Sequence, residues 1–468
     1  MTKKITPLAL ALVTLLTGCS MIPTYERPAA PVPTGFPNVA ASESPATLPS
    51  WRTYFAEPRL QQLIELALNN NRDLRIASLN VEQARAQFQV RRAAQYPAVG
   101  LAANASRAPA SGTGNITNNF SVGLAVTAWE LDFFGRVASL KEQALAQYLA
   151  TEEGRNAAQV SLISSVANGW LNLLADEELL ELSRRTLATR EESVRLTKLR
   201  LDSGAASELD YRQAESLAQA ARATLTQQQR QRALDENALA LLLGQPLPED
   251  IRATLGRSDL NAAPVIQAVP AGLPSDLLVQ RPDIRQAEQQ LIAANANIGA
   301  ARAAFFPRIS LTAQAGTSSG ELSGLFKNGS WGFTLAPSLL LPLFDAGLHQ
   351  ANLESAQASR SVAVAQYEKA IQTAFREVAD ALASQSSLTE QLEAQRKQAE
   401  AESIRFKLAD LRYQNGVASY LDLLDAQRSL FSTQQGVVQV RLSQLQNQVS
   451  LFKALGGGWT DETSSAKP

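Results

Sequence analysis

The feature that most constrains this chain is a proline-free run from 136 to 203, in which apolar side chains recur at every seventh position. The positions are Val166, Leu173, Leu180, Leu187, Val194 and Leu201. This spacing is typical of a helix that packs against partner helices along one seam. At 1.5 Å per residue the helix would be roughly 100 Å long. A rod of that length has no place in a compact globular core, so the sequence predicts an assembly of long partner helices.

The second half of the chain repeats the first. Residues before the second predicted strand find identical partners 210 positions later, and residues after it find them 212 positions later. The matched pairs include Asp73 and Asp283, Pro97 and Pro307, Gly135 and Gly347, Gly204 and Gly416, and Asp210 and Asp422. Such self-similarity predicts two copies of one structural unit.

Each repeat is predicted to hold a first helix, a β-hairpin, a long helix and a return helix, over 58–255 in repeat 1 and 276–456 in repeat 2. The hairpins cover 97–131 and 307–343, the long helices 136–203 and 348–415, and the return helices 205–244 and 417–455. A linker rich in Pro and Gly, 256–275, joins the repeats, and 457–468 form a C-terminal tail. Both are expected near the middle of the helices, where they could form an equatorial belt.

The N-terminus has the layout of a secretory signal peptide, predicted over 1–18. Two lysines precede an apolar run that is too short to span a membrane. The run ends in Leu16-Thr17-Gly18-Cys19, which resembles the bacterial lipoprotein cleavage box and makes Cys19 the lipidated first residue of the mature chain. The alternative is an ordinary signal peptide with an incidental cysteine.

The residues that follow Cys19 predict where the mature chain goes. Ser20, rather than Asp, comes next, which by resemblance to bacterial lipoproteins favours the outer membrane. Residues 19–57 are then predicted to be a lipid anchor and a Pro-rich tether, because closely spaced prolines favour extended chain. We therefore expect a protein that is lipid-anchored in the outer membrane and extends into the periplasm.

In the predicted hairpins, apolar residues recur at every second position instead of every seventh, as in β-strands. Val99, Leu101 and Ala103 alternate with small or polar residues, and Val122, Leu124, Val126 and Ala128 do the same further on. Strands of roughly ten residues can cross a bilayer in a tilted barrel. A half-buried strand in a soluble sandwich alternates in the same way, so alternation alone leaves both interpretations open. The strand around Pro337 is the weakest, since a fully paired strand tolerates proline poorly.

Composition argues against an enzyme and against nucleic-acid binding. The chain has 43 basic and 44 acidic residues, so it carries no general attraction for nucleic acid. It has one histidine and one cysteine, which excludes an internal disulfide and makes a catalytic triad or a zinc site improbable. We therefore expect no catalytic residues, no metal site and no cofactor other than the lipid on Cys19.

Four membrane-length strands cannot close a barrel, because unpaired strand edges are not tolerated in lipid. The chain must therefore oligomerise if its strands enter a membrane. Two chains would supply eight strands and four chains sixteen, and strand count alone does not choose between them. A coiled-coil scaffold with soluble hairpins is the alternative from a different class of protein.

Several motifs resemble those of the outer-membrane efflux proteins, the TolC-like family, and in particular its lipidated OprM-type branch. They are Trp51-Arg52-Thr53-Tyr54-Phe55, Asn71-Arg72-Asp73-Leu74-Arg75, Arg281-Pro282-Asp283-Ile284, Ala303-Ala304-Phe305-Phe306-Pro307 and Leu341-Pro342-Leu343-Phe344-Asp345-Ala346-Gly347. The resemblance covers essentially the whole mature chain. It implies a fold that is mainly α with membrane β: a homotrimer with a 12-stranded outer-membrane β-barrel, four strands per chain, continuous with a 12-helix periplasmic α-barrel.

The function that the resemblance implies is a passive outer-membrane channel of a tripartite efflux pump. Its partners would be a periplasmic adaptor, an inner-membrane transporter of the resistance-nodulation-division (RND) type and outer-membrane lipid. The chain has no Gly-x-x-x-x-Gly-Lys-Ser/Thr loop, so energy has to come from a partner. The alternative within the family is the outlet of a type I protein secretion system or of a metal-ion efflux system.

The same resemblance predicts a periplasmic gate near the turns between the long and return helices. Its residues are Asp210, Arg412, Tyr413, Leu421, Asp422, Asp425 and Arg428. Three chains would bring six carboxylates from Asp422 and Asp425 around one axis, where they would attract cations. The alternative is that these charged residues simply cap their helices. If polar links do not close the tip, a ring of Leu421 could gate by dewetting instead.

The exposed turns are also predicted to be the docking surface for the adaptor. The residues are Gly204 and Ala205 in repeat 1 and Gly416 and Val417 in repeat 2. Their glycines allow a tight reversal of the chain.

The lipid should not be what holds the mature chain in the membrane, because the strands should insert by themselves. We expect Cys19→Ser, secreted with a cleavable signal peptide, to give a membrane-embedded trimer. Membrane fractionation and crosslinking would measure this. Recovery of the variant as a soluble monomer would contradict the barrel.

Overall fold

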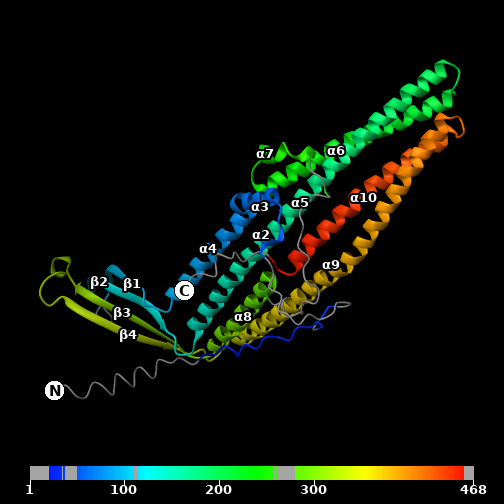
Figure 1. The fold of residues 1–468 in the computed structure, drawn as a ribbon. Coiled ribbons are helices and arrows are strands. Elements are labelled where there is room, and N and C mark those ends of the chain that lie inside the picture. The colour runs from blue at the N-terminus through cyan, green and yellow to red at the C-terminus, as the bar shows by residue number, and fades with distance from the viewer. Residues whose placement is uncertain are drawn as a thin grey trace. The chain divides into compact units, whose positions relative to one another are not determined.

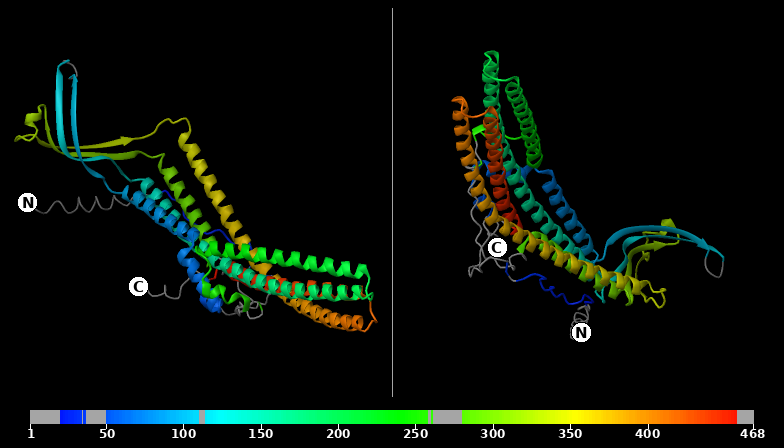
Figure 2. Two further views of the ribbon diagram at one scale, coloured as in Figure 1. Left: turned by 90° about the horizontal axis from the view of Figure 1, so that it is seen from above. Right: turned by 90° about the vertical axis from the view of Figure 1, so that its right-hand side faces the viewer.

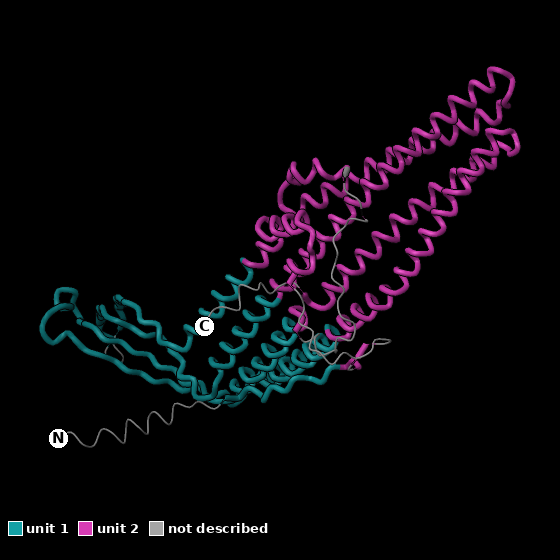
Figure 3. Tube along the Cα trace, in the orientation of Figure 1, with its two compact units in different colours: residues 1–30, 79–153, 285–370 teal, residues 31–78, 154–284, 371–468 magenta. Residues whose placement is uncertain are grey.

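The computed structural model describes residues 20–33, 35–36, 50–109, 114–257, 260 and 280–457. The predicted signal peptide, Cys19 and all but three residues of the predicted linker 256–275 lie outside the described residues, as do 458–468 of the predicted tail. The chain forms two compact units (Figure 3). Unit 1 comprises 1–30, 79–153 and 285–370, and unit 2 comprises 31–78, 154–284 and 371–468.

Helices account for most of the described residues (Figure 1). They are α2 Trp51–Tyr54, α3 Pro58–Asn70, α4 Arg72–Ala93, α5 Arg136–Asp202, α6 Glu208–Leu243, α7 Glu249–Arg252, η1 Leu255–Arg257, α8 Pro282–Ala303, η4 Leu322–Gly324, α9 Leu348–Gln414 and α10 Tyr420–Ala454. The strands are β1 Val99–Pro109, β2 Ile116–Leu131, β3 Arg308–Ser319 and β4 Trp331–Leu340. None of the helices in the described ranges has a stretch both long and apolar enough to cross a bilayer.

The long helices α5 and α9 have 67 residues each. They end within one residue of the bounds that the sevenfold spacing and the repeat predict. In unit 2 each runs into a return helix that lies antiparallel beside it, α6 beside α5 and α10 beside α9 (Figure 2). Each of the two predicted repeats therefore contains one helical hairpin.

The predicted first helix of repeat 1 is broken into two, α3 and α4. Asn71 separates α3 from α4 with extended backbone, φ −61° and ψ 130°. Its side-chain oxygen accepts from the Leu74 backbone N–H at 2.9 Å, and its side-chain nitrogen donates to the Leu242 carbonyl at 2.9 Å. The break is therefore stabilised by a cap on α4 and by a contact with α6, which the local sequence does not reveal.

The region predicted as a Pro-rich tether makes specific contacts. Trp51, Tyr54 and Phe55, in and just after α2, are almost completely buried in unit 2. In unit 1 the N-terminal segment lies against α8, where Arg27 forms a bidentate ion pair with Glu288 at 2.7 and 2.9 Å. Its extended backbone agrees with the proline content, but the segment is docked along the helix instead of free.

The four strands form one antiparallel sheet of order β1-β2-β3-β4 in unit 1. Residues that pair directly across strands share a face, and the register brings the large apolar residues of all four strands to one face. That face carries Val99, Leu101, Val122, Leu124, Val126, Trp129, Leu131, Ile309, Leu311, Trp331, Phe333, Leu335 and Leu339. The opposite face carries small or polar residues such as Asn104, Ser121, Ser310, Gln314 and Thr334.

A β-bulge between Val126 and Trp129 makes this segregation possible. Val122, Leu124 and Val126 are at even positions, whereas Trp129 and Leu131 are at odd positions, and one extra residue brings both sets to the same face. Ala128 lies in the bulge with φ +48°, and its N–H is oriented toward the Thr312 hydroxyl at 3.3 Å. The predicted alternation therefore holds only as far as Val126, and the inclusion of Ala128 in it was wrong.

Two glycines face each other where the hairpins of the two repeats join. Gly123 of β2 pairs with Gly316 of β3. A Cβ on Gly123 would lie 2.4 Å from the Ala315 oxygen, and a Cβ on Gly316 would lie 2.2 Å from the Val122 oxygen. The two strands therefore approach too closely for a side chain at either position.

The edge strand β4 accommodates Pro337, which pairs with Leu311 of β3. In the described part of the chain β1 and β4 each pair on one side only. Within one chain β4 tolerates proline, because the missing N–H of Pro337 can face away from β3.

Glu130 links the end of β2 to the two neighbouring elements of unit 1. Its carboxylate accepts from Arg136, at the start of α5, at 2.6 and 2.7 Å, and pairs with Arg308, at the start of β3, at 2.7 Å. The Glu130 side chain is only 9% exposed, so losing either arginine would leave a poorly compensated carboxylate. This cluster fixes the transition from strand to helix.

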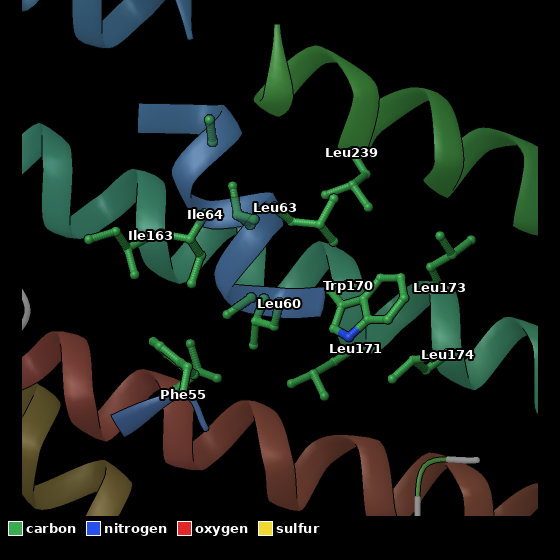
Figure 4. Packing of buried hydrophobic residues seen from close by; sticks show 14 of the residues in the cluster. Phe55, Leu60, Leu63, Ile64, Ile163, Trp170, Leu171, Leu173, Leu174 and Leu239 are labelled. Carbon is green, nitrogen blue, oxygen red and sulfur yellow. The ribbon is translucent and has the colours of Figure 1, made fainter. Parts of the chain in front are cut away.

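The main core lies in unit 2 around the middle of α5 (Figure 4). Ile163, Trp170, Leu171, Leu173 and Leu174 pack against residues of α3, α6 and α10. The Trp170 indole N–H donates to the Glu57 carboxylate at 2.9 Å, so this large buried side chain is also satisfied as a donor. The first half of the predicted seam, Val166, Leu173 and Leu180, is thus buried, whereas Leu187, Val194 and Leu201 are half-buried.

The carboxyl group of Asp176 lies where a negative charge is unfavourable. Asp176 of α5 is 5% exposed, and its Oδ2 has no hydrogen-bond partner among the described residues. The pKa of Asp176 is raised to about 7, first by burial and then by the hydrogen bond and charge of the Asp235 carboxyl and the charge of Glu177, against the opposing effect of Arg232. Asp176 therefore holds a proton in the folded chain at a pH where it is ionised in the unfolded chain.

Asp176 should make the helical unit less stable as pH rises. The folded pKa is raised, so the folded state binds more protons between about pH 4 and pH 7, and this stability is lost as pH rises through that window. We expect Asp176→Asn to reduce the loss of stability between pH 5 and pH 8 by on the order of 1 kcal/mol. Denaturant unfolding followed by circular dichroism measures it, with the exposed Asp202→Asn as the control. An unchanged pH dependence in Asp176→Asn would contradict the assignment.

Candidate gate and docking turns

The two turns between long and return helices have the same backbone geometry. Gly204 and Gly416 have φ of +77° and +73°, a region that favours glycine. The Ala205 N–H donates to the Arg200 carbonyl at 2.7 Å, and the Val417 N–H donates to the Arg412 carbonyl at 2.9 Å. Together with the bonds that the glycine N–H groups donate three residues back, this pattern is a Schellman motif in both repeats.

The residues predicted for adaptor docking therefore have a structural role in the turns. The Gly416 N–H donates to the Tyr413 carbonyl at 3.1 Å, and Val417, which follows it, is 68% exposed. Gly204 and Ala205 are exposed at the corresponding place in repeat 1. An apolar side chain that is fixed by a rigid turn and left in water is suited to contact a partner.

Two of the predicted gate carboxylates cap helices. Asp210 accepts from the Ser207 backbone N–H at 3.1 Å, while the Asp210 N–H donates to Ser207 Oγ at 3.1 Å. Asp422 and Ser419 exchange the same two bonds, each at 3.2 Å. Each pair is a capping box with Asp at the third helical position. Within one chain both carboxylates are thus engaged at the starts of α6 and α10.

Asp425 connects two helices, and its main partner is one that the sequence did not indicate. Its Oδ2 accepts from Arg405 of α9, and its Oδ1 lies 3.3 Å from Arg428 of α10. The Arg405 guanidinium lowers the pKa of Asp425, and Arg428 adds to this effect. Asp425 and Arg428, two of the predicted gate residues, are within one helix, so the link that joins α10 to α9 is the one to Arg405. In the sequence, the only indication of this pair is that Arg405 and Asp425 lie on opposite sides of the turn at Gly416.

Tyr413 lies among aromatic and cationic side chains near the end of α9. Its ring is 5.2 Å from the ring of Tyr420, and the Arg200 guanidinium of α5 is 4.8 Å from its centre. Tyr420 is buried, and Leu423 and Leu424 pack with it in a small apolar cluster. Tyr413 therefore links the two helical hairpins through a cation–π contact.

The two remaining predicted gate residues point to solvent. Leu421 is 57% exposed, and the Arg412 side chain is exposed as well. Leu421 also lines an open cavity of about 330 Å³ with Leu424, Arg428 and Arg212 of α6. The candidate gate thus combines one charged link between α9 and α10, one aromatic contact between hairpins and an exposed leucine.

No group of three or more His, Cys, Asp or Glu side chains in the described ranges is arranged to hold a metal ion. His349, the single histidine, lies at the start of α9 with its Nε2 3.7 Å from Asp345.

The chain thus combines an antiparallel sheet that is apolar on one face and mostly small or polar on the other with two long helical hairpins. The chain belongs to the outer membrane efflux protein family, whose sequence profile matches residues 63–245 and 273–457. Proteins of this family are channels, so the chain is not an enzyme.

Named relatives match the chain over almost its full length. It is 46% identical to the antibiotic efflux pump outer membrane protein ArpC of Pseudomonas putida, over 100% of this chain and 98% of the relative. It is 48% identical to the solvent efflux pump outer membrane protein SrpC of the same species, over 95% of this chain and 97% of the relative. The open state of the Neisseria gonorrhoeae MtrE outer membrane channel superposes with a TM-score of 0.85 at 41% identity, covering 94% of this chain and 99% of that one.

Proposed function

We propose that the chain is the outer-membrane channel of a tripartite RND-type efflux pump and acts as a passive exit duct from the periplasm to the outside. The observation that carries this proposal is the apolar face of the sheet. Trp331, Phe333 and Leu335 of β4 are 69, 73 and 62% exposed, and Leu101 of β1 is 78% exposed. A face this apolar is unstable in water but matches the lipid-facing side of a membrane barrel, whose lumen side is polar.

The proposed assembly is a homotrimer. The edges β1 and β4 would each pair with a neighbouring chain, because an open edge carries unpaired backbone groups that lipid cannot satisfy. Three chains of four strands would give a 12-stranded barrel. Each chain would also contribute two helical hairpins, so that three chains together form a 12-helix barrel in the periplasm. The proposal includes the domain division predicted from the sequence. In this division the lipidated Cys19 is the anchor, and residues 256–275 are part of an equatorial belt.

The proposed cargo and partners follow from the named relatives. One is named for antibiotics and another for solvents, which supports export of small toxic compounds. Both are named as the outer membrane proteins of efflux pumps, so a periplasmic adaptor and an inner-membrane transporter of the RND type are the proposed partners. The energy would come from that transporter.

The proposed gate is the tip formed by the ends of α5 and α9 and the starts of α6 and α10. Asp425 would hold α10 against α9 through Arg405, and Tyr413 would hold one hairpin against the other through Arg200. Opening would break these links, while the capping boxes of Asp210 and Asp422 keep the helix starts intact. Asp422, Asp425 and Leu421 would be repeated three times around the axis, so each link acts cooperatively.

Removal of the link between α9 and α10 should favour the open channel. A single exposed ion pair is worth about 1 kcal/mol or less, and the trimer would lose one in each chain, so Arg405→Ala should increase the open population by up to about fivefold for each link removed. Arg428→Ala should have a smaller effect, because Arg428 lies on the same helix as Asp425. Single-channel conductance in planar bilayers measures this.

The matched control is Lys397→Ala, which removes an exposed ion pair with Glu393 within α9. It should conduct like the parent. If Arg405→Ala also conducts like the parent, the charged link does not close the channel, and the constriction must be sought at Leu421.

The test of the proposed function is efflux in cells that lack their own outer-membrane channel, with the matching adaptor and transporter supplied. The parent chain should restore resistance to the pump's substrates. Val417→Glu should lose this resistance, because a charge on the exposed turn would oppose adaptor docking without disturbing the backbone. Trimer formation and conductance should stay unchanged.

Val362→Glu is the control, because Val362 is also exposed and apolar, at 56%, but lies far from the turn along α9. It should keep full resistance. Full resistance with Val417→Glu would remove this turn from the docking surface, and failure of the parent chain itself to conduct or to restore efflux would overturn the channel assignment.

A further inference from the structure

Proline occurs in the two edge strands of the sheet and in neither inner strand. Pro109 ends β1, and Pro337 lies within β4, whereas the sequences of β2 and β3 have no proline. The equivalent of Pro337 in repeat 1 is Ala125, which lies in the inner strand β2. In this sheet proline is therefore confined to strands that have an open edge, the side on which no strand of the described chain pairs.

The hydrogen-bond pattern shows that the nitrogen of Pro337 faces the open edge of β4. The Ser318 N–H donates to the Ser330 carbonyl at 2.8 Å, and these two residues continue the register of β3 and β4. Because the backbone groups of successive residues point to opposite sides of a strand, the even-numbered residues of β3 and β4 bond to each other. The odd-numbered residues of β4 then face outward, and Pro337 is the one among them that has no N–H. They are Trp331, Phe333, Leu335, Pro337 and Leu339.

The same alternation, followed across the sheet, places Pro109 on the open edge of β1. Odd-numbered residues of β3 bond to even-numbered residues of β2, as at Ala315 and Leu124. Odd-numbered residues of β2 then bond to even-numbered residues of β1, as at Gly123 and Ala102. The odd-numbered residues of β1 face outward, and Pro109 is one of them. Each open edge of the sheet therefore carries a proline in its outward row.

In the proposed homotrimer the two open edges would meet. The strand order makes β4 of one copy antiparallel to β1 of the next. Both outward rows consist of odd-numbered residues, and these also carry the apolar face, as Leu335 and Leu101 do. Pairing one row with the other would therefore keep that face continuous from copy to copy. Because Pro337 lies inside β4, the ladder between two copies would lack one donor.

We propose that Pro337 restrains the open edge of β4, so that this edge pairs stably with β1 of a second copy inside the closed trimer and not with other exposed strands. The inference rests on the proposed homotrimer. An open edge is a template for pairing with any other chain, and a proline that interrupts its row of donors weakens every such pairing. In the trimer the remaining donors and the contacts between helices compensate for the missing bond. An accidental pair of edges has only the interrupted ladder.

Pro337→Ala tests the inference, because alanine is the residue at the equivalent position of β2. The first measurement is the rate at which the purified full-length trimer dissociates in SDS at a fixed temperature, followed by gel electrophoresis. The restored N–H should slow dissociation by about two- to tenfold, which corresponds to about 0.5–1.5 kcal/mol for one hydrogen bond. The second measurement is aggregation after urea-unfolded chains are diluted into buffer without detergent, followed by thioflavin T fluorescence. Pro337→Ala should aggregate more than the parent, because its edge offers an uninterrupted row of donors.

The matched control is Pro342→Ala, which removes a proline that follows β4 and lies outside the strand. It should leave both measurements as in the parent. If Pro337→Ala does not form a trimer, Pro109→Ala tests the same idea on the open edge of β1 and should change both measurements in the same directions.

The two measurements together distinguish a restrained edge from a strand that the substitution merely loosens. A loosened strand would give more aggregation and a trimer that dissociates faster, whereas the inference requires more aggregation and a trimer that dissociates more slowly. Dissociation at the parental rate or faster, or aggregation no greater than that of the parent, would overturn the inference. Failure of the parent chain itself to form a trimer would instead overturn the proposed assembly.

Discussion

The fold depends on burial of the apolar seam of α5, because most of the stability of a helix in a protein comes from tertiary packing of its apolar face. In the middle of the helix, the seam residues Val166 and Leu173 are buried with residues of α3, α6 and α10. Toward the end of α5 the seam residues Leu187, Val194 and Leu201 are only half-buried. The same helix is therefore a core element in its middle and a surface element at its tip. The candidate gate lies where least apolar burial opposes movement.

Periodicity and repetition carried most of the fold prediction. The seven-residue spacing predicted α5, and the internal repeat predicted α9, because the spacing and the repeat are both long regular patterns. Two local events escaped prediction. Asn71 breaks an apolar pattern that continues through it, since its reason is a bond to Leu242 on another helix. The bulge before Trp129 inserts a single residue into a regular alternation, and only the partner strand reveals it.

The candidate site was predictable in its place but not in its pairings. A glycine turn beside charged residues marks the tip in both repeats, and the resemblance to the family supplied the residues. The partner of Asp425 is Arg405, on the other side of the turn, and such a pair depends on how two helices pack.

The close contact of Gly123 and Gly316 has a consequence for how the two halves can change over time. These glycines are not repeat equivalents of each other, because the counterpart of Gly123 is Leu335 and that of Gly316 is Ser106. A methyl group on either one would collide with the backbone of the opposite strand, and neither position can mutate alone without moving both strands. At this point the halves have stopped being independent copies, and drift in one is restrained by the other.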